Sequence, residues 1–164
     1  GITIMADDYR IEIEGFDSLR QRLTPEKMRR GLRTGMQIVT FQLKSDLIEN
    51  LRGRILKRQN GNLSGGVTSE VVEEDGSIIG QIGNTVRWRW KGRSGSLLEV
   101  HEKGATIRPR EPGGYLRFKI GQNWITTKQV VIPAREPVKK TVQAKLIAIK
   151  NNLRTALLRE LRGE

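Results

Sequence analysis

The chain has 164 residues, with 30 Lys and Arg against 18 Asp and Glu, and a net charge of +12. This length predicts a single domain over residues 1–164. The absence of Cys excludes a disulfide framework, thiol catalysis and a cysteine-ligated metal, and the single His leaves little for a zinc site. No cofactor is expected.

Membrane insertion and secretion are not expected from this sequence. No apolar run approaches the roughly 18–20 residues of a membrane span. The first six residues lack a basic region and a long apolar stretch, so we expect no signal peptide. These features indicate a soluble, basic protein made inside the cell.

The charge is divided into blocks along the chain. Residues 24–58 and 85–119 each hold nine bases and three acids, and residues 135–164 hold eight bases and three acids. Residues 59–84 hold four acids and no base. Such blocks suit contact with a polyanion or contact between neighbouring subunits, and composition alone does not decide between them.

The N-terminal third predicts one long helix. Residues 9–13 alternate as a short strand does, and Asp17 can cap a short helical turn. Thr24 and Pro25 are typical of a helix start, with a capping hydroxyl before proline. One apolar stripe follows and predicts a helix to about Gly53, which can cap its C-terminus; the stripe is Met28, Leu32, Met36, Val39, Leu43, Leu47 and Leu51.

Two glycines interrupt this helix. Gly31 and Gly35 lie four residues apart, on one face. Each costs up to ~1 kcal/mol relative to Ala, so they either weaken the helix locally or allow another backbone to approach closely. Both interpretations stay open at this point.

The middle of the chain predicts strands and loops. Residues 58–66 and 91–96 are rich in Gly and polar side chains, which predicts mobile loops. Strands are expected at 67–72 and 77–82, around a turn at Glu73–Gly76. A further strand is expected at 86–90 and a pair of strands at 115–120 and 130–132, with another starting near Ile107. Residues 97–100 form a short apolar segment.

A second long helix closes the chain. Pro137 opens it, and its apolar residues recur at the spacing of the first helix: Val138, Val142, Leu146, Ile149, Leu153, Leu157 and Leu161. Strands grouped between helices predict an α+β fold, with an antiparallel strand-rich middle bracketed by two long amphipathic helices.

Two groups of bases are candidates for contact with DNA or with a neighbouring subunit. Cations in the first turns of a helix are unfavourable beside its dipole, so an anionic partner is favoured over a merely solvated face for the first group: Lys27, Arg29, Arg30 and Arg33. The second group alternates with two tryptophans on a predicted strand and its loop: Arg87, Arg89, Lys91 and Arg93. Strand alternation sends Trp88 and Trp90 to the face opposite the bases, where core packing is the favoured interpretation.

The acidic residues of the hairpin turn are interface candidates of opposite sign. Glu73, Glu74 and Asp75 form either a solvated tip or a contact with a basic patch of the next subunit. His101 lacks a second His or Cys, so a structural histidine is expected there. With no acid–base or metal constellation, an enzyme is not predicted.

Several short motifs, in order from about residue 11 to 160, resemble the tail-completion, or phage virion-morphogenesis, family of tailed bacteriophages. They are Ile13–Leu19 before the first helix, Asn60–Ser64 after it, Ile82–Asn84 with Val86, Leu98–Gly104, and Val131–Arg135 before the last helix. Trp88–Arg89 stands where this family usually has Tyr-Ala, and Glu136 separates Arg135 from Pro137.

This resemblance implies a structural virion protein of the head–tail junction, made in the cytoplasm of a bacterial host. It implies a tail-completion or tail-terminator ring, a hexamer that joins the tail tube to head-completion and neck proteins. Inside such a ring the basic groups would touch double-stranded DNA without reading its sequence. The alternative is a stand-alone basic nucleic-acid-binding module.

Overall fold

The computed structural model describes residues 9–11, 24–56, 61–90 and 92–162. The chain divides into two compact units. We call residues 1–86 with 137–164 the helical unit, and residues 87–136 the strand unit. Helices and antiparallel strand pairs are both present, which confirms the predicted α+β class. The predicted helical turn after Asp17 lies outside the described residues.

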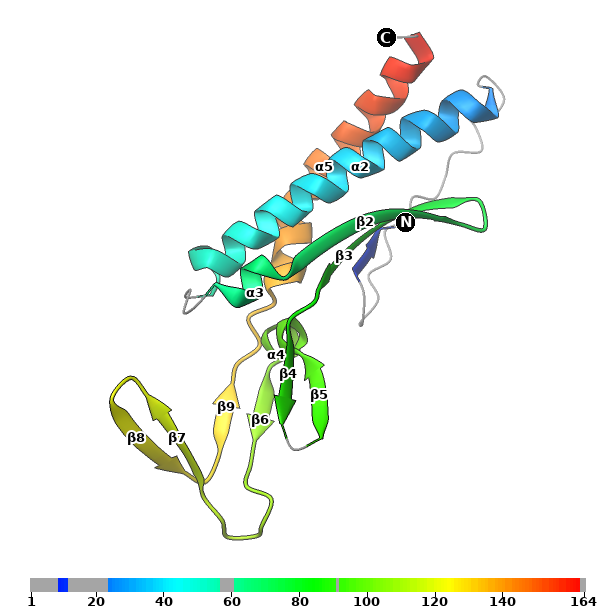
Figure 1. Ribbon diagram of the computed structural model, residues 1–164. Coiled ribbons are helices and arrows are strands. Elements are labelled where there is room, and N and C mark those ends of the chain that lie inside the picture. Colours follow the sequence, from blue (N-terminus) through cyan, green and yellow to red (C-terminus); the bar gives the residue numbers. More distant parts are fainter. Residues whose placement is uncertain (1–8, 12–23, 57–60, 91, 163–164) are drawn as a thin grey trace. The chain divides into compact units, whose positions relative to one another are not determined.

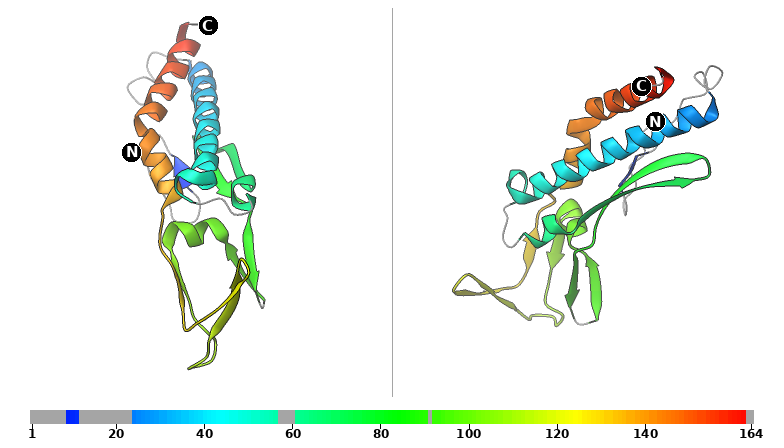
Figure 2. Two further views of the ribbon diagram at one scale, coloured as in Figure 1. Left: turned by 90° about the vertical axis from the view of Figure 1, so that its left-hand side faces the viewer. Right: turned by 45° about the horizontal axis from the view of Figure 1, so that its top comes forward.

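The helical unit pairs two long helices with a long β-hairpin (Figure 1). Its elements are β1 (Tyr9–Ile11), α2 (Pro25–Glu49), η1 (Asn50–Arg54), α3 (Asn62–Gly65), β2 (Val67–Glu74), β3 (Ser77–Asn84) and α5 (Pro137–Arg162). The three strands form one antiparallel sheet in the order β1-β3-β2. Helices α2 and α5 lie side by side in both views of Figure 2.

The core of this unit lies where the predicted apolar stripes meet. Buried side chains of α2 face those of α5, and the hairpin adds Ile79, Ile82 and Val67. The buried helix residues are Met36, Val39, Leu43 and Leu47 from α2 with Val138, Val142, Ile149, Leu153 and Leu157 from α5. The stripes predicted from helical periodicity are confirmed at these positions; Met28, Leu32 and Leu146 are half-buried, and the Leu161 side chain lies outside the described part of the structure.

Gly31 and Gly35 mark the closest approach of the two helices. A Cβ atom on Gly35 would lie 3.0 Å from Ala156 Cβ and 3.4 Å from Leu153 Cα. One on Gly31 would lie 3.3 Å from Leu157 Cα. Close backbone approach, the second of the two interpretations, is what these glycines permit.

The ends of α2 differ from the sequence prediction. The helix begins at Pro25 as expected, but the Thr24 side chain makes no capping hydrogen bond. At the other end Gly53 has φ 166°, an extended conformation and not a left-handed cap. The helix instead widens into the π-turn η1, and Asn50 Nδ2 donates to Thr141 Oγ1 of α5 at 2.7 Å. The backbone N–H groups of Ile55 and Leu56 donate to the Asn50 carbonyl oxygen at 3.0 and 3.2 Å, in place of the glycine cap that sequence alone suggested.

The β2–β3 hairpin is longer than predicted. Glu74 pairs with Ser77, so only Asp75 and Gly76 form the turn. Both have positive φ, 48° and 77°, as a type I′ turn requires. Gly80 of β3 lies against Thr40 and Met36 of α2, where a Cβ atom would clash with both. This glycine lets the hairpin pack closely on the helix.

The strand unit consists of three separate strand pairs and one short helix. Its elements are β4 (Arg87–Trp90), β5 (Arg93–Ser96), α4 (Leu97–Lys103), β6 (Ala105–Ile107), β7 (Leu116–Ile120), β8 (Asn123–Thr127) and β9 (Val130–Ile132). The pairs are β4–β5, β6–β9 and β7–β8, all antiparallel. Leu98 is the only large apolar side chain of its described residues that is buried.

Several predictions for loops and strand partners are wrong. Residues 93–96 form β5, because Gly95 passes under the Trp88 indole, where a Cβ atom would lie 2.8 Å from Nε1. Residues 62–65 form α3; residues 58–60 lie outside the described part of the chain. Residues 97–103 form a helix capped by Ser96, whose Oγ accepts from Glu99 N at 3.3 Å.

The strands at 116–120 and 130–132 do not share a hairpin. Strand β7 pairs with β8, a strand that the sequence analysis missed, and β9 pairs with β6. The turn between β7 and β8 has two residues. The first of them, Gly121, has a positive φ, as a type II′ turn requires. The missed strand begins directly after this turn, at Asn123.

Candidate nucleic-acid interface

The first group of bases lies on α2 and finds its anions within the chain. Arg29 donates to both carboxylate oxygens of Glu73, from Nε at 2.8 Å and from a terminal guanidinium nitrogen at 2.6 Å. Arg33 lies 4.0 Å from the same carboxylate, and Arg30 lies 3.7 Å from Glu160 of α5. Lys27 is exposed on the same helix. Three of the four candidate cations thus have a carboxylate of their own chain nearby.

The three acidic residues of the hairpin turn differ in their contacts. The hydrogen bond from Arg29 lowers the pKa of Glu73; burial opposes this, and the charges of Arg29 and Arg33 lower the pKa further. The same hydrogen bond raises the pKa of Arg29. Glu74 and Asp75 are exposed and form no ion pair with any described residue. Glu73 therefore fixes the hairpin to α2, while the other two carboxylates stay available.

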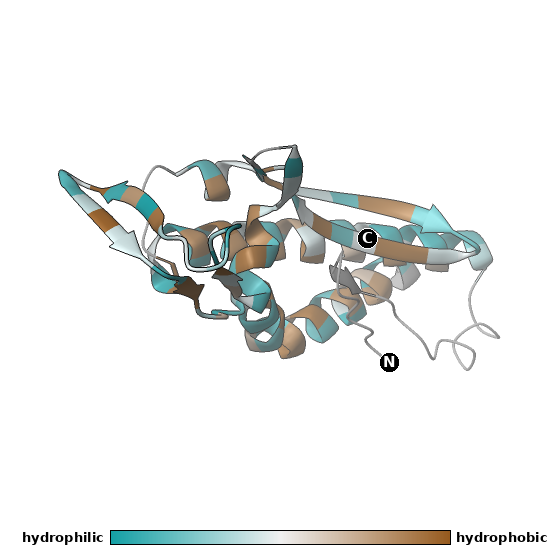
Figure 3. Ribbon diagram, turned by 90° about the horizontal axis from the view of Figure 1, so that it is seen from below, coloured by the Kyte–Doolittle hydropathy of each residue, from teal (hydrophilic) through white to brown (hydrophobic). Residues whose placement is uncertain are grey.

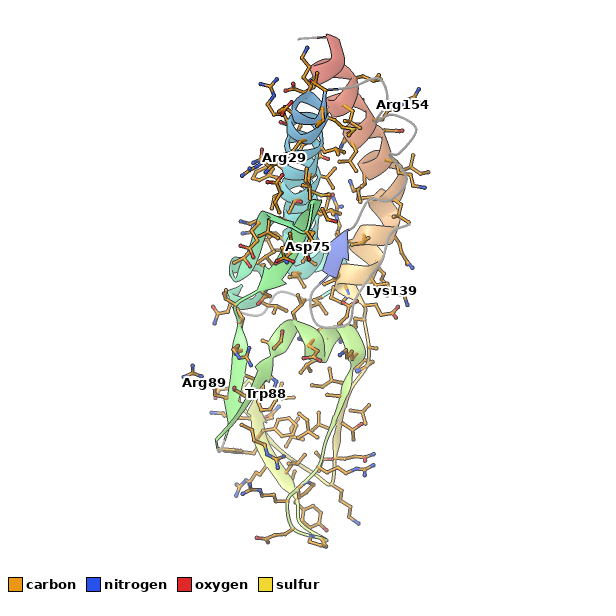
Figure 4. The ribbon with its side chains drawn as sticks, turned by 90° about the vertical axis from the view of Figure 1, so that its right-hand side faces the viewer. Arg29, Asp75, Trp88, Arg89, Lys139 and Arg154 are labelled. Atoms are coloured by element: carbon orange, nitrogen blue, oxygen red, sulfur yellow. The ribbon has the colours of Figure 1, made fainter. Side chains whose placement is uncertain are left out.

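The second group of bases lies in the strand unit. Arg87, Arg89 and Arg93 are exposed on β4 and β5, and Lys91 lies outside the described residues. Arg89 and Trp88 lie on opposite sides of β4 (Figure 4). Trp88 is 37% exposed and rests on Gly95, so its interpretation as core is wrong. The Trp90 side chain lies outside the described part of the structure.

Sequence reasoning about single sites missed the rest of the basic surface. Within 87–136 the chain has eleven Lys and Arg against four Glu. Eight described cations of this unit are exposed and have no carboxylate partner among the described residues. Three of them are the predicted Arg87, Arg89 and Arg93, and the five that were missed are Arg108, Arg110, Arg117, Lys119 and Lys128. The charge of block 85–119 was the signal that could have found most of them.

One of these cations is paired with an aromatic ring. The Arg117 guanidinium carbon lies 4.9 Å from the ring centroid of Trp124, across the β7–β8 pair. Trp124 itself is 62% exposed. A cation over an indole face is attractive by about 0.5–1 kcal/mol at exposed sites, so the ring orients the guanidinium without neutralising it.

His101 lies in the strand unit on α4. Burial lowers its pKa, and the charge of Arg135 lowers it further. Its Nδ1 is buried without a hydrogen-bond partner, and its carbonyl oxygen accepts from the Arg135 backbone N–H at 2.9 Å. No cluster of three or more His, Asp or Glu among the described residues could hold a metal ion.

One groove of about 320 Å³ lies between α2 and α5. Its rim carries the Lys145–Asp46 ion pair at 3.2 Å and the Asn152–Gln42 hydrogen bond at 2.6 Å. Each of these polar groups has its partner on the opposite helix. The two pairs therefore add to the contact between α2 and α5.

Comparison of the chain with protein-family models, curated proteins and solved structures found no match. Among the described residues, no helix is long and apolar enough to cross a membrane. The exposed, unpaired cations of the strand unit are the strongest candidate site that the geometry offers.

Proposed function

We propose that this protein is a structural subunit of the phage head–tail junction. In this proposal it forms a tail-completion or tail-terminator ring, a hexamer, that joins the tail tube to the head connector and surrounds the DNA channel. It acts in the virion with the tail-tube and neck proteins, and it has no catalytic role. The sequence resemblance described above suggests the family, and features of the strand unit support assembly.

The observation that carries the proposal is how few large apolar side chains the strand unit buries: among its described residues only Leu98 is buried. A lone two-stranded hairpin is marginally stable in water, and this unit has three strand pairs in place of one sheet. Large apolar side chains are exposed on it, among them Tyr115 at 63%, Val131 at 61% and Ile120 at 58%. Clustered exposed apolar side chains are typical of protein–protein interfaces. A ring subunit would cover these side chains with its neighbours, through a heterologous contact between two different patches.

The unneutralised charge of the same unit supports a DNA-facing role. Eight exposed cations without carboxylate partners repel one another unless an anion lies between them. Duplex DNA in a channel would supply phosphates without any need for sequence recognition. The same observation also favours the second candidate, a stand-alone nucleic-acid-binding module, so the oligomeric state separates the two.

The test is the assembly state of the purified full chain. Mass photometry over a concentration series and negative-stain electron microscopy should show a closed cyclic oligomer. Addition of a tail-tube protein encoded beside this chain's gene should recruit that oligomer to tube ends. A protein that stays monomeric at all concentrations and ignores tubes would overturn the ring and leave the stand-alone module.

A further inference from the structure

We propose that the β7–β8 hairpin is a DNA-binding ribbon, whose cationic face contacts the phosphates of double-stranded DNA. This assignment rests on the proposed function for the source of the DNA. It names a contact element that neither the motifs nor the candidate bases of the sequence had indicated.

The ribbon has two chemically distinct faces. Residues directly opposite in an antiparallel pair share a face, and successive residues alternate. Arg117 pairs with Thr126 and Lys119 with Trp124, and all four are exposed. The opposite face is mainly apolar: Leu116, Phe118, Ile120 and Ile125 lie on it, together with Asn123 and Thr127. Figure 3 shows the resulting alternation of hydrophilic and hydrophobic residues along this hairpin, at the left of the view.

Charge complementarity points to a polyanion as the occupant of the cationic face. Neither Arg117 nor Lys119 has an ion pair with a described residue. A second copy of the chain could offer Glu74 and Asp75 from its hairpin turn, but two carboxylates, which match the two cations of the ribbon face, cannot also balance the other six unpaired cations of the strand unit. A nucleic-acid backbone carries enough charge to do so.

The shape of the ribbon favours a duplex over a single strand. The major groove of B-DNA, about 12 Å wide, admits a two-stranded β-ribbon. Proteins that hold single strands present a series of aromatic platforms to successive bases. The cationic face of this ribbon has one aromatic ring, Trp124, and Arg117 lies over one of its sides. A single covered ring orients a guanidinium toward phosphate better than it stacks a run of bases.

Salt dependence of duplex binding provides the test. Fluorescence anisotropy of the full chain with a labelled duplex of mixed sequence is measured from about 50 to 200 mM salt. The slope of log K against log salt is negative, and each phosphate contact adds about 0.9 to its magnitude. Loss of two contacts should therefore make the slope less steep by about 1.8. The test variant is R117Q/K119Q, and R117K should keep the wild-type slope.

The matched control removes the same charge from the helical unit. Lys150 and Arg154 are exposed on α5, so K150Q/R154Q changes net charge equally without touching the ribbon. The proposal expects this variant to keep the wild-type slope. Equal slope changes in both double variants would overturn the ribbon assignment, because binding would then follow net charge alone.

Two further outcomes would also overturn it. Absence of duplex binding at low salt would leave an acidic protein surface as the occupant. Preference for a single strand, abolished by W124L, would show base stacking in place of groove contact. Mass photometry of the same samples tests the ring separately from the ribbon. If the protein forms rings but R117Q/K119Q keeps the wild-type salt slope, only the ribbon assignment is wrong. If the protein is a monomer and R117Q/K119Q changes the salt slope, only the proposed ring is wrong.

Discussion

The two units of this chain use similar residues for different purposes. In the helical unit, Arg29, Arg30 and Arg33 lie beside carboxylates of the same chain, and the apolar stripes are buried. In the strand unit most of the described cations have no such partner, and apolar side chains such as Ile120 are exposed; Phe41 of α2 and Ile147 of α5 are exposed as well. A folded core satisfies its own side chains, whereas a surface that leaves both charge and apolar area unsatisfied is suited to partners.

The largest expected difference between the units is in core truncation. Leu43 is 1% exposed, so Leu43→Ala should lower the free energy of unfolding by about 2–5 kcal/mol. Ile120→Ala, at an exposed position, should change it by less than about 0.5 kcal/mol in the monomer. Urea unfolding at low protein concentration, followed by circular dichroism, measures both. An equal loss at Ile120 would show that the strand unit has a core of its own.

The helix contact at Gly35 should be the next most sensitive. Gly35→Leu would push a side chain into Ala156 and Leu153, and overpacking of this kind costs about 1–3 kcal/mol. Gly65→Leu is the matched control, because a Cβ atom there meets nothing within 4 Å. If both variants unfold at the same urea concentration, the close approach of α2 and α5 does not matter for stability.

Substitution of an exposed apolar residue in the strand unit should weaken self-association without changing the stability of the monomer. Ile120→Ser removes exposed apolar area from the β7–β8 hairpin and should weaken self-association by about tenfold, which corresponds to about 1.4 kcal/mol. Gln122→Ser, in the turn of the same hairpin, should leave association unchanged. Mass photometry at several concentrations gives both constants. Equal association of the two variants would remove this face from the subunit interface.

The single histidine permits a direct pH measurement in the strand unit. Because burial and then Arg135 lower the pKa of His101 in the fold, its neutral form is favoured there. The stability that neutral His101 contributes is present above the pKa of the unfolded state, about 6.5, and is lost as pH falls through the lower pKa of the folded state. NMR titration of the one imidazole should give a folded pKa below that value, and Arg135→Gln should raise it only in part. A folded pKa at or above the unfolded value would contradict the burial of this ring.

The Arg29–Glu73 pair should give the smallest effect, since Arg29 is 69% exposed and the pair lies at the surface, where water screens it. The lowered pKa of Glu73 means that its contribution to stability exists above the unfolded pKa and disappears as pH falls through the folded one. Glu73→Gln should therefore be slightly destabilising at pH near 7 and equal to wild type in acid. Glu74→Gln removes the same charge without the bond to Arg29 and should show less pH-dependent difference in urea unfolding.

Much of the fold was predictable from local patterns. Helical periodicity predicted α2, α5 and their buried stripes, and Asp75–Gly76 predicted the long hairpin, because these signals depend on neighbouring residues. Strand β5 was missed because its Arg-Ser-Gly-Ser composition is typical of loops, and pairing with β4 overrides that weak preference. Strand β8 was also missed, although Trp124, Ile125, Thr126 and Thr127 favour a strand and could have predicted it.

The sequence by itself determined the two long helices, the long hairpin, the net charge and the division of bases into blocks. Only the tertiary structure decided which of those bases are neutralised, because Arg29 meets Glu73 across 44 residues of chain and Arg30 meets Glu160 from the far end. It also decided that Gly31 and Gly35 are contact points between helices and that Trp88 is half-exposed. Charge and periodicity are local properties of a sequence, whereas partnership depends on which distant segments the fold brings together.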